Sequence, residues 1–374
     1  MTVLDYTPDQ LRALPDREFE TIAAELLKLQ SHDRQVNQLS YYRPVNERAA
    51  IVHTSTDRML GVGGGNGSSK TDTCLVELII RATGQVPASL QTTYPREKLR
   101  GPIRARVVVE SLTTTLYPII LPKLQWQQWS GVSEPGGEKG HWGWIPRHCL
   151  INSEWAKSWT DKLRLLRVLY RDPADPKRVV GESLIQFMSY DQDPTDFASG
   201  DLHFVLHDEP PRYEIWRENR ARIMRVDGTA MVAMTWPDDP AINVDWILDE
   251  LYDKAAQGVK GIGWVTLYTT ENPHLNQDAV SFQAKQMSAH ERQTRIYGQP
   301  IRMSNRVHPL FTDTTRHWCV ECKEDVIRNE GGACGNCGGR TLPFNHVQPV
   351  VAHREYPVVF ALDPHPRKPH CMIW

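Results

Sequence analysis

The chain has 374 residues, enough for one large domain with one or two smaller units. Its hydrophobic and charged fractions, 40% and 24%, are those of a globular protein, and no run approaches the roughly 18 apolar residues of a membrane span. The formal net charge of −2 provides no overall basic field for nucleic acid, although a few well-placed cations suffice for phosphate contacts. The acidic N-terminus lacks a secretory signal, so we expect a soluble cytoplasmic protein with no membrane partner.

The predicted elements begin with an amphipathic helix over residues 16–30, with Asp16 as N-cap, which we expect to pack beside the core. A short strand at 58–62 leads into the glycine-rich segment 63–71, and a helix follows from 71 to the glycine stop at Gly84. Further strands are predicted at 103–110, 184–190, 202–207, 230–235 and 262–268, with helical or irregular stretches between them. Residues 128–150 are predicted as a long surface excursion. Several strands are continuous apolar runs, which indicates a buried parallel sheet in an α/β fold.

The segment between the first strand and its helix carries the groups that a nucleoside triphosphate needs. Backbone N–H groups must converge on the phosphates, a lysine must reach the terminal ones, and a hydroxyl must meet a magnesium ion. Lys70 and Thr71 supply the last two, while Ser69 stands where the strict pattern has glycine. A mobile glycine-rich surface loop is the alternative. The predicted nucleotide-binding residues are Gly64, Gly65, Asn66, Gly67, Ser68, Ser69, Lys70 and Thr71.

The strand predicted at 202–207 ends in two adjacent carboxylates, Asp208 and Glu209. Hydrolysis requires one carboxylate to organise magnesium and another to activate water. We assign Asp208, with Thr71, to magnesium and Glu209 to the catalytic base. His207 is interpreted either as a strand-end histidine with satisfied contacts or as a polar contact near the nucleotide. An acidic pair after an apolar strand is common, but with the phosphate loop and its Lys70 upstream it predicts an ATPase.

Four of the seven cysteines form two pairs separated by eleven residues. This spacing lets two backbone knuckles present four thiolates to one tetrahedral zinc ion. Four thiolates leave no coordination position for water, so a structural role is favoured over catalysis. A disulfide is the alternative, and contact with DNA through nearby basic residues is left open. The predicted zinc ligands are Cys319, Cys322, Cys334 and Cys337.

Several segments resemble the large terminases of tailed bacteriophages, over most of residues 40–363. They are GGNGSSKT at 64–71, the segment 187–211 before and through the acidic pair, AMTWP at 233–237, ENPHL at 271–275 and ERQTRIYGQP at 291–300. The resemblance implies a P-loop ATPase of the additional-strand type, with a central, mostly parallel sheet flanked by helices and a helical lid.

The predicted domains are 1–240, an N-terminal helical region and the ATPase core; 241–304, the remaining ATPase strand and a lid or linker subdomain; 305–350, a zinc-ribbon insert; and 351–374, the first strands of a truncated RNase H-like nuclease domain.

The resemblance also implies roles for individual residues. Thr235 would sense the hydrolysed phosphate and couple it to the lid, with Asn272 as a lid-side contact; an ordinary β-branched residue at a strand end is the alternative for Thr235. Many terminases carry an arginine in the phosphate loop where this chain has Asn66, so the cation must come from elsewhere. Arg222 is a candidate arginine finger, acting in trans, and a solvated or structural helix arginine is the alternative. The adenine contact is unassigned, although Asn46 or Glu47 stands near the expected position.

A terminase of this kind would use ATP, Mg²⁺ and Zn²⁺ and would translocate double-stranded DNA into a procapsid in the host cytoplasm. Its expected partners are the portal protein, the small terminase subunit and copies of itself in a homo-oligomeric ring. Asp363 resembles the first acid of the nuclease, and because the others would lie beyond residue 374 we expect no DNA cleavage. Two alternatives remain: another DNA-dependent P-loop motor such as a helicase or repair translocase, and a zinc-ribbon DNA-binding adaptor with an inactive nucleotide fold.

Overall fold

The computed structural model describes residues 14–127, 141–237, 244–300, 316–326, 328, 332–344, 361–363 and 371–373. Within these ranges only the backbone is described at 126–127, 141–142, 316, 324–325, 344, 361–363 and 371–373. The internal contacts of the chain divide it into two units, 1–304 and 305–374. No helix in the described part of the chain has the length and apolar character to cross a bilayer.

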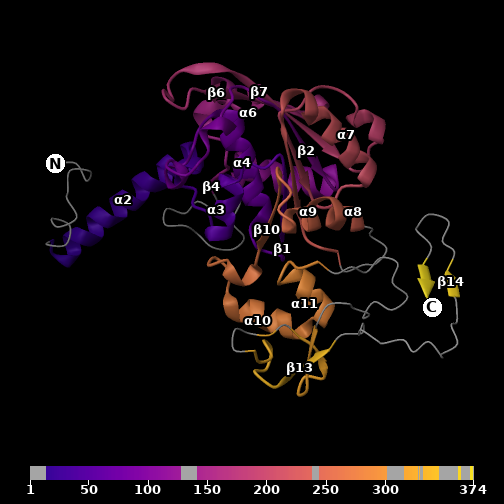
Figure 1. The fold of residues 1–374 in the computed structure, drawn as a ribbon. Coiled ribbons are helices and arrows are strands. Elements are labelled where there is room, and N and C mark those ends of the chain that lie inside the picture. The colour runs from indigo at the N-terminus through magenta and orange to yellow at the C-terminus, as the bar shows by residue number, and fades with distance from the viewer. Residues whose placement is uncertain are drawn as a thin grey trace, which may run out of the picture. The chain divides into compact units, whose positions relative to one another are not determined.

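Figure 1 colours the α-helices and strands in the order in which they follow along the chain. The helices are α2 (Asp16–Val36), α3 (Glu47–Thr54), α4 (Lys70–Thr83), α5 (Leu121–Gln125), α6 (Trp155–Ser158), α7 (Tyr213–Ile223), α8 (Asp245–Ile247), α9 (Asp253–Ala256), α10 (Gln277–Gln286) and α11 (Ala289–Arg295). The strands of the first unit are β1 (Met59–Gly64), β2 (Arg104–Val109), β3 (Trp126–Gln127), β4 (His141–Trp142), β5 (Trp159–Thr160), β6 (Leu165–Arg171), β7 (Val179–Ser189), β8 (Phe204–Asp208), β9 (Thr229–Met234) and β10 (Ile262–Leu267). Those of the second are β11 (Arg316–Cys319), β12 (Glu324–Asp325), β13 (Thr341–Phe344), β14 (Ala361–Asp363) and β15 (Cys371–Ile373).

An eight-stranded sheet forms the centre of the first unit, in the order β10-β1-β9-β8-β2-β7-β6-β5. The strands from β10 to β7 are parallel to their neighbours, whereas β6 and β5 pair antiparallel at one edge. Strand β9 lies between β1, which leads into the phosphate loop, and β8, which carries the acidic pair. This inserted strand is the additional strand of the predicted P-loop architecture. The predicted fold class is therefore confirmed.

Helices cover both faces of the sheet because its central strands are apolar on both faces. In β8, Phe204 and Leu206 pack into a core that includes side chains of α3 and α4. Val205, between them, packs into a second core with Trp216 of α7 and Ile247 of α8. Figure 1 shows α4 and α7 on opposite sides of the strands. The continuous apolar runs of the sequence thus follow from burial on two sides.

The first helix differs from its prediction in length and packing. Helix α2 continues to Val36, its N-cap is Pro15, and Asp16 is the first helical residue. None of its residues is buried, and Phe19 and Leu27 are about half exposed. The expectation that it packs beside the core is therefore wrong. Helical periodicity identifies an apolar face but does not specify what covers it.

Two further differences lie near the antiparallel edge. Strand β6 was expected to be helical or irregular, because outward-facing Leu165 and Leu169 hide its alternation of buried and half-buried residues. The predicted surface excursion at 128–150 is also too long. Ile145, Cys149 and Leu150 are buried in the main core, while residues 128–140 lie outside the described part of the chain.

Helix α4 carries a buried carboxylate near its middle, Glu77. Glu77 is fully buried, with Lys98 and Arg81 each at 2.7 Å and His53 at 3.0 Å. Burial raises the pKa of Glu77, but the neighbouring Lys98 and Arg81 outweigh it and hold that pKa well below its ordinary value. The hydroxyl of Tyr94 also donates to this carboxylate, at 3.2 Å. The cluster joins α4 to α3 and to the connection before β2.

We expect Glu77→Ala to lower the free energy of unfolding by about 3–5 kcal/mol, because it leaves two nearly buried cations without their counter-charge. Urea denaturation at neutral pH measures the change. Arg167→Ala is the matched control, since it breaks an exposed ion pair with Glu182 and should cost under about 1 kcal/mol. Equal effects of the two substitutions would show that the buried cluster does not stabilise α4.

Candidate nucleotide and metal sites

The phosphate loop joins β1 to α4 and curls around the main-chain carbonyl of Gly65. The ammonium of Lys70 and the hydroxyl of Ser68 both donate to this carbonyl oxygen, each at 2.8 Å. Gly67 and Ser69 have φ values of +73° and +67°, the left-handed region in which successive N–H groups can be turned toward an anion. A Cβ added at Gly65 would lie 2.3 Å from Thr269 Oγ1. Close packing therefore requires glycine at this position.

The order of the strands brings the loop and the acidic pair together. Thr71, the second residue of α4, donates from Oγ1 to Asp208 Oδ1 at 3.0 Å, although 137 positions separate them in the sequence. Lys70 is only 8% exposed, and burial lowers its pKa while the nearby negative charges of Glu209 and Asp208 oppose that shift. The lysine, the hydroxyl and both carboxylates thus belong to one site.

Glu209 is held by hydrogen bonds to three residues, Ala233, Thr235 and Tyr190. Its backbone has φ of +71°, a strained conformation for a residue with a side chain, and its N–H donates to Ala233 O in β9 at 2.7 Å. Its side-chain Oε2 accepts from the N–H of Thr235 at 3.1 Å, and its carbonyl accepts from the hydroxyl of Tyr190 at 2.8 Å. Thr235 therefore contacts the predicted base through its main chain. Tyr190 was not anticipated from the sequence.

The two carboxylates of the pair are difficult to ionise. Burial raises the pKa of Asp208 to about 6, against the Thr71 hydrogen bond and the charge of Lys70. Burial likewise raises the pKa of Glu209 to about 7, against the Thr235 N–H and Lys70. A buried carboxylate of this kind is short of positive charge, and its oxygen beside the Thr71 hydroxyl offers the ligand type that Mg²⁺ prefers. These residues fit a magnesium ion.

The outer side of the loop is tied to the segment that follows β10. Asn272 donates from Nδ2 to Gly67 O at 2.7 Å and to Ser69 Oγ at 3.1 Å. Thr269 donates from Oγ1 to Asn66 O at 2.8 Å, and Asn66 N donates to the carbonyl of Arg295, the last residue of α11, at 2.6 Å. Asn272 was expected to be a lid-side contact, whereas sequence reasoning missed Thr269.

Arg222 lies away from the phosphate loop of its own chain. Its carbonyl accepts from Leu202 N, which precedes the amino end of β8, whereas Asp208 ends the same strand. Its guanidinium donates to Ala198 O at 2.7 Å. A role as arginine finger therefore stays a prediction for contact between chains, and the contacts of Arg222 within this chain are those of a structural helix arginine.

Two other polar residues near the site have local partners. His207 is fully buried between Tyr190 OH at 3.3 Å and Asn219 Nδ2 at 3.4 Å, and burial lowers its pKa to about 3. It is a strand-end histidine with satisfied contacts. Asn46 caps α3, where its side chain accepts from Ala49 N at 2.8 Å. Adenine recognition stays unassigned.

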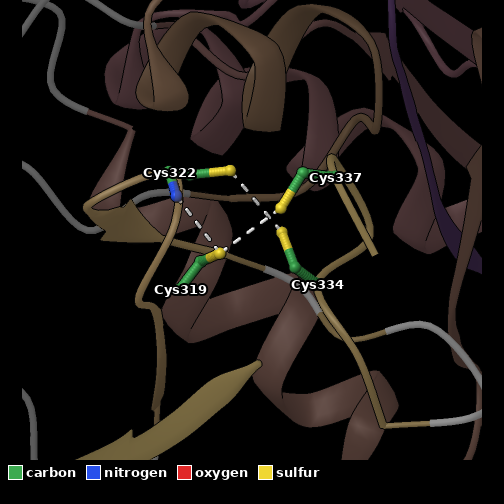
Figure 2. A group of neighbouring side chains, drawn as sticks. All are labelled: Cys319, Cys322, Cys334 and Cys337. Carbon is green, nitrogen blue, oxygen red and sulfur yellow. Dashed lines mark hydrogen bonds between the residues drawn. The ribbon is translucent and has the colours of Figure 1, made fainter. Parts of the chain in front are cut away.

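The four paired cysteines meet in the second unit. Figure 2 shows their sulfur atoms directed toward a common centre, and all four lie within 4.8 Å of one another. The sulfurs of Cys319 and Cys337 are 3.5 Å apart and those of Cys322 and Cys334 are 3.9 Å apart. Tetrahedral Zn–S bonds place sulfurs about 3.8 Å apart, whereas a disulfide requires about 2 Å. The thiols are free, so the cluster fits a zinc ion rather than disulfides.

The backbone around the cluster has the form of a small ribbon. Strands β12, β11 and β13 make a three-stranded antiparallel sheet, and the N–H groups of Cys322, Asn336 and Gly339 donate to cysteine sulfurs at 3.3–3.4 Å. Asp363 ends β14, which pairs with β15 opposite Cys371. The side chain of Asp363, and with it the predicted nuclease acid, lies outside what the structure describes.

No protein-family model and no curated protein matches the chain. Among solved structures it resembles the large terminase ATPase domain of Thermus phage P74-26, with 14% identity over 70% of this chain and 96% of that one and a TM-score of 0.42. It also resembles the large terminase of another thermophilic bacteriophage, with 9% identity over 68% and 53% of the two chains and a TM-score of 0.46. A complex of the latter with ADP is similar at 12% identity over 67% and 52%, with a TM-score of 0.44. The chain spans about half of this second phage protein. Because these identities and scores are low, the functional proposal rests on the residues of this chain.

The raised pKa of Glu209 predicts a more stable protein when that carboxyl is neutralised. Between the ordinary value of 4.5 and about 7, the folded chain binds a proton that the unfolded chain has lost, so stability falls as pH rises through this window. We expect Glu209→Gln to stabilise the fold by about 1–3 kcal/mol at pH 8, with the gain shrinking toward pH 5. Urea titrations at several pH values measure this. Glu25→Gln on the exposed face of α2 is the control, and a pH-independent gain would contradict the assignment.

The cysteine cluster predicts one zinc ion per chain. Elemental analysis of the purified protein should give a zinc-to-protein ratio near one, and replacing Cys319 or Cys334 with serine should abolish it. Because Cys74 is buried elsewhere and unpaired, Cys74→Ser is the matched control and should leave the zinc content unchanged. If the zinc-free chain were fully stable, the fold of the ribbon would not depend on a metal ion, and the prediction would be wrong.

Proposed function

We propose that this chain is the ATP-hydrolysing motor of a tailed-phage DNA-packaging terminase. The observation that carries the hydrolytic part is the 3.0 Å contact between Thr71 and Asp208, with Lys70 and Glu209 in the same buried site. A glycine loop alone binds phosphate, but a loop joined to a base-bearing strand also has the groups to cleave it.

Each residue has a distinct part in the proposed reaction. Lys70 leaves the Gly65 carbonyl and pairs with the terminal phosphates, while main-chain N–H groups of the loop hold the remaining oxygens. Thr71 and Asp208 would hold the magnesium ion, which would neutralise charge on the phosphates. Glu209 orients a water molecule and accepts its proton. Its raised pKa of about 7 suits a group that must take up a proton near neutral pH.

The packaging role is supported by the order of segments that resemble terminases. Thr235 directly follows the strand inserted between the loop and the acidic pair, and Asn272 donates hydrogen bonds to the loop from the segment before α10. Both are therefore suited to pass a change at the phosphates to the proposed lid. The proposal includes double-stranded DNA as the translocated polymer, a portal protein and a small terminase subunit as partners, and a homo-oligomeric ring in the host cytoplasm as the working form.

The proposed ATP hydrolysis predicts that the chain has ATPase activity stimulated by double-stranded DNA. Lys70→Ala and Glu209→Gln should each reduce the turnover rate by about 10²–10⁴-fold, because one removes the phosphate-binding cation and the other the base. A phosphate-release assay measures the loss. Glu25→Gln should retain the wild-type rate. An inactive wild-type chain would instead favour a zinc-ribbon adaptor with a non-catalytic nucleotide fold.

A second measurement separates packaging from other DNA motors. ATP-driven protection of DNA from nuclease inside purified procapsids, lost in Glu209→Gln, would establish packaging. Strand separation of forked DNA without any procapsid dependence would identify a helicase instead, and the terminase assignment would then be wrong even though the ATPase site is correct.

A further inference from the structure

A second lysine lies beside the candidate nucleotide site. Lys123 belongs to α5, in the segment that follows β2, and β2 is the direct neighbour of β8 in the sheet. The two strands are parallel, with Val108 opposite His207, so the segment after β2 starts at the same edge where Asp208 ends. Lys123 belongs to none of the sequence motifs and has no part in the reaction proposed above.

Lys123 forms an ion pair with the first turn of α4, the helix that follows the phosphate loop. Its Nζ lies 2.5 Å from Asp72 Oδ2, and the side chain is only 16% exposed. Asp72 directly follows Thr71, whose hydroxyl bonds Asp208. The charge of Lys123 also acts on Asp208 and, after that of Lys70, helps to oppose the rise in its pKa. The partner of this ammonium is therefore the residue next to a proposed magnesium ligand, and the ammonium is within electrostatic reach of the acidic pair.

The chemistry of the site has a place for such a cation. In phosphoryl transfer, negative charge develops on the terminal phosphate. In related reactions this charge is stabilised by one lysine, one magnesium ion and an additional cation. Segment 63–69, which includes Asn66, contains no charged residue. Arg222 lies at the other end of β8 in its own chain.

We propose that Lys123 is a second cation of the nucleotide site, which Asp72 holds beside α4 and which the phosphates of bound ATP draw toward them. This inference rests on the proposed ATPase function and adds a residue to it. Asp72 offers one negative charge, whereas the polyphosphate offers several, so the ammonium has an electrostatic reason to exchange partners. No covalent step is involved, because Lys123 only stabilises charge.

The competing explanation is purely structural. Trp144 Nε1 also donates to Asp72, at 3.0 Å from Oδ1, and the main chains of Lys123 and Trp144 are hydrogen-bonded at 2.9 Å. Asp72 could therefore serve only to fasten the segments 121–127 and 141–145 to α4. In that case every substitution that loosens the Asp72 contacts should have a similar effect.

Three variants separate the explanations. Lys123→Met removes the cation and its ion pair. Asp72→Asn removes the ion pair but keeps the cation and an acceptor for Trp144. Trp144→Phe removes the other bond to Asp72 and keeps the cation, while a ring remains against Tyr42, whose centroid lies 5.5 Å from that of Trp144. For each variant, kcat and KM of DNA-stimulated ATP hydrolysis and the urea midpoint are measured on the full chain.

If Lys123 acts on the phosphates, Lys123→Met should lower kcat by about 10²-fold, with a much smaller change in KM, and Lys123→Arg should restore much of the loss. Asp72→Asn and Trp144→Phe should keep kcat within a few-fold of wild type even if their urea midpoints fall. Equal kcat values for Lys123→Met and Asp72→Asn, or losses that track the urea midpoint in all variants, would overturn the inference. An inactive wild-type chain would contradict the proposed function instead, so the two failures are distinguishable.

Discussion

Parallel strands that end at one edge of a sheet bring distant segments together, and the candidate nucleotide site depends on this constraint. Thr71 lies in the first turn of α4, which follows β1 and its loop, and Asp208 is the last residue of β8. Their 3.0 Å contact exists because both strands point the same way. Strand β9 separates them by one position in the sheet. Its end therefore lies between the loop and the acidic pair, where the N–H of Thr235 reaches Glu209. The inserted strand is thus part of the site as well as part of the fold.

Helix α4 carries contrasting charge environments along its length. Within the protein, Glu77 meets Lys98 and Arg81 at 2.7 Å, and these cations keep it ionised and stabilising. Near the start of the helix, Asp208 and Glu209 are buried with less neighbouring positive charge. Both carboxyls therefore have raised pKa values, and their burial lowers the stability of the fold. A helix anchored by paired charges at its middle can support an end where charge is left unbalanced. Activity of this type and maximal stability oppose each other at such positions.

Local sequence patterns predicted the parts of the molecule whose functional residues are close together in the sequence. The phosphate loop, the acidic pair and the spacing of Cys319 to Cys337 are short motifs, and the strands beside them have continuous apolar runs. Contacts across the fold left little local trace: Thr269 and Tyr190 are ordinary polar residues until β10 and β7 place them beside Asn66 and Glu209. The same limit explains why α2 was assigned to the core, since an amphipathic pattern does not identify its partner.

The contacts of the loop indicate how a change at the phosphates can leave the site. The carbonyls of Asn66 and Gly67 accept hydrogen bonds from Thr269 and Asn272, and the N–H of Asn66 donates to the end of α11. In the proposed reaction, a shift of the loop main chain would act directly on the segment that carries α10 and α11, without requiring the side chain of Thr235. Thr235 instead engages Glu209 through its N–H, a group that every residue except proline retains. Coupling of the phosphates to α10 and α11 through main-chain groups would depend on backbone geometry more than on the identity of the side chains. For such coupling, the positions of β9 and β10 beside β1 would matter more than which residues stand at the ends of these strands.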